Sequence, residues 1–457
     1  MIKKIGALML ALVMVLSLGS VAFATNAADM SGQSGVIGEF TTPDTPDTQD
    51  DTVVIYKEIT AYNPESCVVN APTITYNYTI GAATVAAGTT ITDNASHHNQ
   101  ISGADVNAQV AVKAGVGSPT ITGTDVRVLA ITPTDQLNAS EYGTANRFAL
   151  TLDFSSIDWA TDGTGAGVYR YVIAETTTTA TKNAAGIAEG TIAKTLYIDV
   201  YVDGSGNIYG YTLFNNNSSI DATTSDADAA SSAGKTEGFV DDPANTEYTS
   251  ANASTADKYY TFNLTLTKDV VNDAYAESTH HQFPFTVTLD NPTVTAAVLP
   301  IMTVGANATQ SALTAAAIGT GATLTTWTPT IADSATVTYV GIPCGTTITV
   351  KETNNVTGVT YNSVSTNADT DAAAKSINTS EDSNTATINC NATALTAAQE
   401  NHTAAATKVV TFTNTLIQIS PTGVVLRIAP YVLMLGAGVT LFVILMVKRR
   451  KTSEEEA

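Results

Sequence analysis

The amino-acid sequence predicts an all-β protein in which two tandem β-sandwich domains lie between an export signal and a C-terminal membrane helix. Three observations carry this prediction. Thr, Ala, Asn, Ser and Val dominate the composition and Leu is scarce, which favours strands and turns over helices. Segments with alternating or β-branched residues recur along the chain. Long apolar runs occur only near the two ends.

The N-terminal segment has the features of a secretory signal peptide. Lys3 and Lys4 precede an almost unbroken apolar run over 5–21, and a small-x-small motif ends at Ala24. We therefore expect residues 1–24 to be removed after Ala24. Residues 25–51 follow as a linker whose last part (TTPDTPDTQDD) is too polar to pack.

The C-terminal segment, 418–457, combines a short motif with a membrane span. The sequence SPTG at 420–423 precedes an apolar segment at 424–447 and a basic KRRK cluster. The segment can cross about 30 Å of hydrocarbon as a helix, with the basic cluster on the cytoplasmic side. An ordinary membrane anchor is one interpretation. The motif also resembles a sortase sorting signal of the Leu-Pro-x-Thr-Gly type, with Ile419 in the leucine position, which implies cleavage between Thr422 and Gly423.

The charge and cysteine content of the mature chain exclude several classes of protein. Without the predicted signal and tail, about 13 basic and about 39 acidic residues remain, so nucleic acid and anionic lipid would be repelled. The three cysteines are too few for a disulfide framework, although a Cys344–Cys390 bridge is an open alternative. The histidine pairs lack the spacing of zinc ligands, so we expect no metal and no cofactor.

Two β-rich regions define the domains, 52–256 and 257–417. A polar interval over 215–256 forms the last part of the first domain, and the turn DGSGN at 203–207 predicts a hairpin. The Ala-rich segment Ala312–Ala317 is expected as a short loop helix. The expected strands begin at Val53 and include Thr73–Ile80, Phe148–Phe154, Tyr169–Ile173, Leu196–Val202, Ile208–Leu213, Phe262–Val271, Phe283–Leu289, Thr336–Tyr339, Thr347–Glu352 and Lys408–Thr415.

Three polar residues of the second domain have the strand parity of buried apolar positions. Lys268 shares a face with residues 262, 264 and 266, Glu352 with 348 and 350, and Asn414 with 410 and 412. Burying any one of them alone would cost several kcal/mol. Each could instead lie at a strand end and reach water.

Buried together, these three groups could react with one another. Desolvation lowers the pKa of a lysine, and a neutral amine can attack an asparagine carboxamide and expel ammonia. A protonated glutamate would assist by moving protons, and proximity would lower the barrier. The reaction occurs once per chain, so the protein would cross-link itself and not act as an enzyme.

The second domain resembles those of streptococcal-type major pilins. The segments FNLTLTK (262–268), FPFTVTL (283–289), IPCGTTITVKE (342–352) and VTFTN (410–414) follow one another as in that family. The resemblance implies Cna-B-like, immunoglobulin-type domains with internal isopeptide bonds. It assigns the cross-link to Lys268 and Asn414 and the catalytic role to Glu352.

The first domain is similar to the N-terminal module of the same family. FSSIDW (154–159) and GVYRYVIAE (167–175) carry this resemblance, which places Glu175 in the glutamate position. Lys57 shares a face with residues 53 and 55 and is the candidate nucleophile. Asn245 fits the family order best as its partner, and the asparagines at 215–217 compete with it.

The resemblance also implies how the chain is used. A sortase would pass the Thr422 acyl group to a lysine of another pilin subunit or to peptidoglycan, and Lys235 has the family's acceptor position. A solvated surface lysine is the alternative. We therefore expect a pilus backbone subunit, secreted and attached to the wall of a Gram-positive bacterium. The competing hypothesis is a monomeric wall-anchored adhesin that binds a host ligand or glycan.

Overall fold

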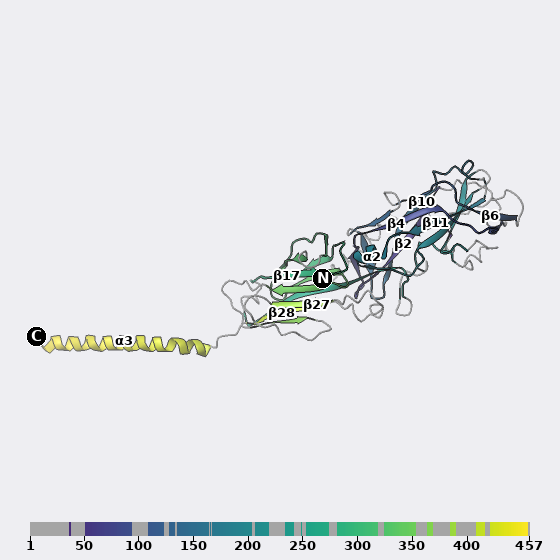
Figure 1. Ribbon diagram of the computed structural model, residues 1–457. Coiled ribbons are helices and arrows are strands. Elements are labelled where there is room, and N and C mark those ends of the chain that lie inside the picture. The colour runs from purple at the N-terminus through teal and green to yellow at the C-terminus, as the bar shows by residue number, and fades with distance from the viewer. Residues whose placement is uncertain are drawn as a thin grey trace, which may run out of the picture.

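The computed structural model shows two β-rich bodies arranged end to end, and helix α3 (Pro421–Glu455) carries the C-terminus (Figure 1). Strands dominate the described residues, so the predicted all-β class is confirmed. The structure describes residues 36–37, 51–93, 108–122, 128–132, 135–163, 165, 167–202, 206–218, 234–241, 248, 253–273, 281–318, 324–352, 363–368, 384–389, 408–415 and 421–455. The predicted signal peptide and nearly all of the predicted linker lie outside these residues.

The first domain is a sandwich between an 8-stranded sheet and part of a 10-stranded sheet. The 8-stranded sheet contains β1 (Val36–Ile37), β14 (Ile208–Phe214), β13 (Thr195–Val202), β11 (Gly167–Glu175), β4 (Ile74–Ala82) and β8 (Val128–Ile131). Two further strands complete it: β6 (Ala108–Ala114) pairs with β11, and β5 (Thr90–Asp93) pairs with β6. The antiparallel pairing of β13 with β14 confirms the hairpin expected from the DGSGN turn. Strands β3 (Cys67–Asn70) and β9 (Gln136–Ala139) form a separate two-stranded sheet.

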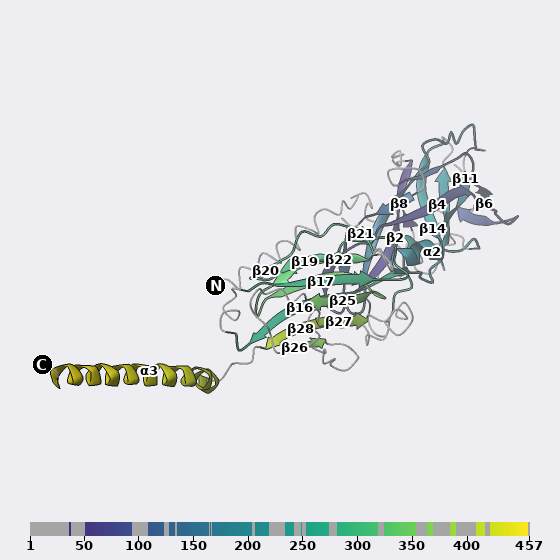
Figure 2. The ribbon, with the colours of Figure 1, turned by 60° about the vertical axis from the view of Figure 1, so that its left-hand side comes forward.

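The 10-stranded sheet runs through both domains. Its path is β19 (Ile301–Val304), β24 (Thr336–Pro343), β16 (Asp257–Val271), β2 (Thr52–Tyr62), β10 (Thr144–Asp153) and β7 (Thr120–Thr122). Four further strands join it: β12 (Ile187–Ala188) and β28 (Lys408–Thr415) beside β16, β15 (Gly238–Phe239) beside β2, and β26 (Ser363–Ala368) beside β28. Strands β16, β28 and β26 lie side by side in Figure 2.

The second domain closes with a 6-stranded sheet. This sheet contains β20 (Ala308–Thr309), β23 (Thr330–Ile331), β17 (Phe283–Asp290), β25 (Thr347–Glu352) and β27 (Asn384–Asn389), with β22 (Thr325–Trp327) beside β17. Residues of β16, β24 and β28 face it across one buried apolar cluster. In that cluster the rings of Phe285 and Phe412 meet edge to face, with 5.1 Å between their centroids.

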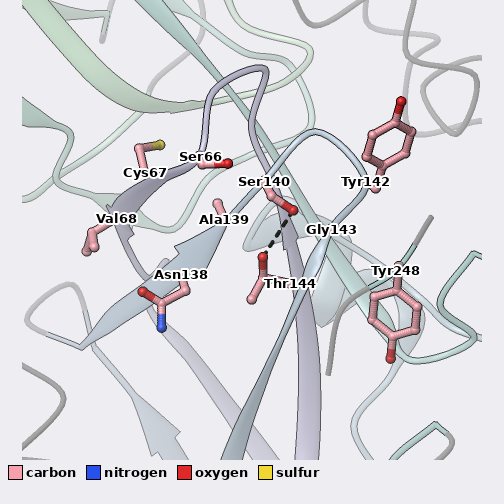
Figure 3. A pocket seen from close by; sticks show the side chains of 10 residues that line it. All are labelled: Ser66, Cys67, Val68, Asn138, Ala139, Ser140, Tyr142, Gly143, Thr144 and Tyr248. Carbon is pink, nitrogen blue, oxygen red and sulfur yellow. Dashed lines mark hydrogen bonds between the residues drawn. The ribbon is translucent and has the colours of Figure 1, made fainter. Parts of the chain in front are cut away.

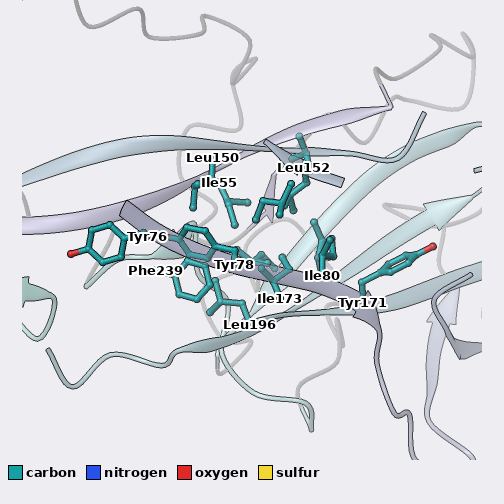
Figure 4. Packing of buried hydrophobic residues seen from close by; sticks show 14 of the residues in the cluster. Ile55, Tyr76, Tyr78, Ile80, Leu150, Leu152, Tyr171, Ile173, Leu196 and Phe239 are labelled. Carbon is teal, nitrogen blue, oxygen red and sulfur yellow. The ribbon is translucent and has the colours of Figure 1, made fainter. Parts of the chain in front are cut away.

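The core of the first domain follows from strand alternation. Apolar side chains of β2 and β10 pack against side chains of β4 and β11 from the other sheet (Figure 4). Phe239 of β15 enters the same core, where its ring centroid lies 5.2 Å from that of Tyr78. The polar interval before the second domain thus contributes a core residue that its low apolar content did not reveal.

Strand β16 links the two domains because its two halves serve different sandwiches. Residues 257–260 pair in parallel with β2, whereas residues 264–271 pair in parallel with β28. At the junction the rings of Tyr62 and Tyr260 stack with centroids 4.6 Å apart. The buried side chains of Asn63 and Asn263 exchange hydrogen bonds of 2.9 and 3.0 Å. Backbone pairing and a satisfied polar contact therefore join the domains.

One expected helix is absent from its place, and one observed helix was not expected. Ala316–Ala317 form β21, which pairs with β18 (Ala297–Val298), and the rest of the expected helix at 312–315 has no helical structure. Helix α2 (Thr179–Ala184) was not predicted, because six residues rich in Thr show no apolar period. Its first turn is capped by the Thr178 hydroxyl, which accepts a hydrogen bond of 3.2 Å from the Thr181 amide.

Candidate functional site

The candidate site of the second domain lies between its two sheets. Lys268 lies near the end of β16, Asn414 lies on the neighbouring strand β28, and Glu352 ends β25 in the facing sheet. All three side chains are completely buried. The parallel register pairs Val270 with Asn414, so the lysine lies two residues before the partner of the asparagine. Alternation therefore sends both side chains to the same interior face.

The contacts within this site suit an amine, a carboxamide and a proton donor. Asn414 Nδ2 lies 2.6 Å from Glu352 Oε1, and Lys268 Nζ lies 3.6 Å from Glu352 Oε2. Lys268 Nζ also donates 3.0 Å hydrogen bonds to the carbonyls of Phe412 and Asp269. Among the described residues, Glu352 Oε2 and Asn414 Oδ1 accept no hydrogen bond. The site thus contains two buried oxygens whose hydrogen-bonding capacity is not satisfied.

Burial changes the protonation of this site in the direction that the chemistry needs. Desolvation lowers the pKa of Lys268 to about 8, although Glu352 opposes the change. Desolvation also raises the pKa of Glu352, against the opposing effects of Lys268 and Asn414. Near neutral pH, transfer of a proton from the amine to the carboxylate therefore costs far less than in water. The product is a neutral nucleophile beside a neutral acid.

The site of the first domain contains four charged side chains. Lys57 Nζ lies 2.8 Å from both Glu175 Oε2 and Asp257 Oδ2. Lys182 Nζ of helix α2 lies 2.5 Å from Glu175 Oε1 and 2.9 Å from Asp257 Oδ2. These four residues are between 1% and 7% exposed, so their charges can be tolerated only because they compensate one another.

Sequence reasoning missed two members of this cluster, Asp257 and Lys182. Asp257 falls on the predicted domain boundary, where no apolar strand had yet begun to mark a buried face. Lys182 lies on the helix that the sequence did not reveal. The predicted partner Asn245 lies outside the described residues. Of its competitors, Asn215 and Asn217 are exposed beyond the end of β14, so neither lies in the core with Lys57.

Further polar contacts hold the carboxylate of Asp257 in place. The Gly190 amide donates a 2.8 Å hydrogen bond to Oδ1, and the Tyr76 hydroxyl donates one of 3.1 Å to Oδ2. Burial alone would raise the pKa of Asp257, but Lys57 and Lys182 outweigh it and keep the pKa below its usual value. Likewise, Asp257 and Glu175 raise the pKa of Lys182 against the effect of burial.

The residues proposed for sorting lie at two other places. Lys235 is partly exposed and forms an isolated antiparallel β-bridge with Phe214, the last residue of β14. Thr422 and Gly423 fall in the first turn of α3. Within that helix, the window Tyr431–Lys448 has a mean hydropathy of 2.1 and is long enough to cross a membrane. Of the two cysteines considered as a bridge, Cys344 is buried and Cys390 lies outside the described residues.

One pocket of about 380 Å³ lies beside the small sheet of β3 and β9 (Figure 3). Its lining provides hydroxyl, amide and small apolar groups without any charged side chain. Cys67 is its only thiol, and burial raises the pKa of that thiol to about 11, so it is not a nucleophile at neutral pH. The lining residues are Ser66, Cys67, Val68, Asn138, Ala139, Ser140, Tyr142, Gly143, Thr144 and Tyr248.

Solved structures that are similar to the chain include two bacterial pilins. The chain is similar to a major pilin from Streptococcus pyogenes. That match has 15% identity and a TM-score of 0.36, and it covers 81% of this chain and 99% of the pilin. The major pilin T-13 of the same species matches with 15% identity and a TM-score of 0.34, over 80% of this chain and 100% of the pilin.

Two further matches are an adhesin and a family model. An adhesin from Mobiluncus mulieris, described as containing disulfide, isopeptide and ester cross-links, matches with 13% identity and a TM-score of 0.21 over 83% of this chain and 94% of its own. Residues 262–416 match a family model described as a domain of unknown function, DUF7601. No curated protein matches the chain.

Proposed function

We propose that the protein is a structural subunit of a bacterial surface pilus, and that its second domain closes on itself with an isopeptide bond between Lys268 and Asn414. The buried contact between Glu352 and both of these residues carries the proposal. The neutral amine of Lys268 attacks Cγ of Asn414, and the C–N bond of the carboxamide breaks. Glu352 delivers a proton to the departing nitrogen, which leaves as ammonia, and takes one from the attacking amine.

The position of this bond suits a protein that carries tension. Lys268 lies on the first strand of the domain and Asn414 on the last, and the two strands are parallel neighbours. A pull on the two ends of the domain would otherwise be resisted only by hydrogen bonds and packing between these strands. An amide between them transmits the force through covalent bonds. A stalk built from such subunits would stay folded under load.

Assembly is proposed to use the two C-terminal features together. A membrane helix would hold the exported chain while a sortase cleaves after Thr422 and transfers the acyl group to an amine. Lys235 of a neighbouring subunit is the proposed acceptor in the pilus, and peptidoglycan is the acceptor at its base. Lys235 is a partly exposed residue, whereas Lys57, Lys182 and Lys268 are buried, so these three cannot serve.

Replacing the acceptor lysine tests the assembly proposal. Lys235→Arg keeps the charge but removes the usable nucleophile, because a guanidinium stays protonated. Wall extracts of cells with this variant should contain monomer and no ladder of high-mass species. Lys194→Arg, at a side chain that is 46% exposed, is the matched control and should leave the ladder intact. A normal ladder from Lys235→Arg would reject this acceptor, and a monomer in the unaltered protein would favour the adhesin.

A further inference from the structure

We propose that the first domain also closes covalently, by an amide between Lys57 and Asp257, and that Lys182 remains beside it as the counter-ion of Glu175. This inference deepens the proposed function, on which its mechanical meaning rests. The bond differs from that of the second domain in its acyl donor, a carboxylate in place of a carboxamide. It therefore releases water and not ammonia.

The backbone register selects this pair. In the second domain, the residue two places after Lys268 is paired with Asn414 across parallel strands β16 and β28. In the first domain, the residue two places after Lys57 is paired with Asp257 across parallel strands β2 and β16. The two lysines thus stand in the same position relative to the carbonyl carbon on the next strand. Asp257 occupies the place that Asn414 occupies in the other domain.

The acidic partner is also repeated. Glu175 is the last residue of β11 and Glu352 the last residue of β25, and each strand belongs to the sheet that faces the lysine. Each carboxylate contacts its lysine, at 2.8 Å for Lys57 and 3.6 Å for Lys268. The first domain therefore contains a nucleophile, an acyl donor and a glutamate in the arrangement of the second domain.

Lys182 is the additional group, and it approaches from a different direction. It lies on α2, outside the paired strands, and touches Glu175, Asp257 and Glu189 at 2.5, 2.9 and 3.3 Å. Lys182 lies about as close to Asp257 as Lys57 does, so distance does not decide which lysine reacts. The strand register decides it, because only Lys57 lies two residues before the strand partner of the acyl donor, as Lys268 does in the second domain. Lys182 is thus a positioning residue.

Charge compensation explains why the first domain needs a second lysine. Before reaction, two ammonium groups and two carboxylates balance in the buried cluster. Joining Lys57 to Asp257 removes one charge of each sign and leaves Lys182 paired with Glu175. In the second domain no other lysine contacts Glu352 among the described residues, so its carboxyl must keep a proton when Lys268 becomes an amide. In the first domain, the positive charge of Lys182 compensates Glu175 after the reaction, so Glu175 does not need to keep a proton.

The step balances without any added reagent. The Lys57 ammonium loses a proton to the cluster and its amine attacks Cγ of Asp257. The hydrogen bonds from Gly190 and Tyr76 draw negative charge from the two carboxylate oxygens. One oxygen leaves as water with two protons that came from the ammonium, and the third stays on the new amide. Loss of two buried charges favours the product, since neither ion is solvated there.

Tandem mass spectrometry of a digest of the full-length protein tests the inference directly. The expected product is a branched peptide in which Lys57 is joined to Asp257, lighter than its two parts by about 18 Da, the mass of water. A branch from Lys57 to Asn245 would overturn the inference, as would unmodified Lys57. The branch between Lys268 and Asn414, lighter by about 17 Da, is measured in the same digest. Its absence would reject the proposed cross-link of the second domain alone, so the two failures are distinguishable.

Variants of the two lysines separate their roles. Lys57→Arg should abolish the loss of water, because an arginine cannot be joined. Lys182→Arg should still lose water, because an arginine preserves the positive charge beside Glu175. Lys182→Met should reduce the linked fraction at least several-fold, since a carboxylate then lacks its counter-ion. Rescue by arginine would not occur if Lys182 were the nucleophile. Loss of the bond in Lys182→Arg with a folded second domain would therefore overturn the assignment.

Discussion

Replacing Glu352 by glutamine should prevent the cross-link of the second domain while keeping the shape of the site. Glutamine can still contact Asn414, but it cannot carry the proton that the reaction moves between Lys268 and the departing nitrogen. The second domain of the variant should have the full mass calculated from its sequence, without any loss of ammonia. The unaltered protein should be lighter there by about 17 Da, the mass of ammonia.

The loss of stability can be estimated from the loop that the bond closes. Lys268 and Asn414 are about 146 residues apart in sequence, and closing a loop of that length lowers the entropy of the unfolded chain by an amount worth about 5 kcal/mol at 25 °C. A domain of about 160 residues unfolds with an entropy near 340 cal/mol/K. The Tm of the second domain should therefore fall by roughly 15 °C.

Calorimetry and intact-mass measurement on the same samples provide the assay. Lys351→Gln is the matched control, because this neighbour is exposed on the same strand and should change neither quantity. A Glu352→Gln protein that still lacked about 17 Da would refute the role of the glutamate. A protein without the bond but with an unchanged Tm would refute the estimate from loop closure.

Two further predictions concern buried charges. Asp199→Ala leaves the buried Arg170 without the carboxylate that binds it at 2.7 and 2.8 Å. The free energy of unfolding, measured with urea, should fall by about 3–5 kcal/mol, and adding Arg170→Met should restore much of this loss. Asn414→Ala keeps Lys268 as a free amine, whose pKa near 8 is below its unfolded value of about 10.4. The unfolded state then binds more protons than the folded state, so the free energy of unfolding of this variant should rise by up to about 3 kcal/mol between pH 8 and pH 10. The double variant Asn414→Ala/Lys268→Met has no amine at this position and should not show the rise. A flat profile would contradict the buried, proton-poor amine.

The sequence by itself determined the secondary structure class and one of the two candidate sites. Strand alternation depends only on local geometry, so the parity of Lys268, Glu352 and Asn414 with their apolar neighbours could be read along each strand. The structure places all three in the interior. The apolar helix near the C-terminus was equally visible, because length and hydropathy are properties of one continuous segment.

Only the tertiary structure decided which groups meet in the first domain. Asp257 becomes buried because β16 continues from one domain into the other and pairs with β2, a contact between residues about 198 positions apart. Lys182 enters the same site from a helix whose six residues carry no apolar pattern. Neither position has a local signal, since burial of an ion is stable only when its counter-ions arrive from distant parts of the chain. The partner of Lys57 was therefore a property of strand pairing and charge compensation, and the local sequence around Lys57 could not specify it.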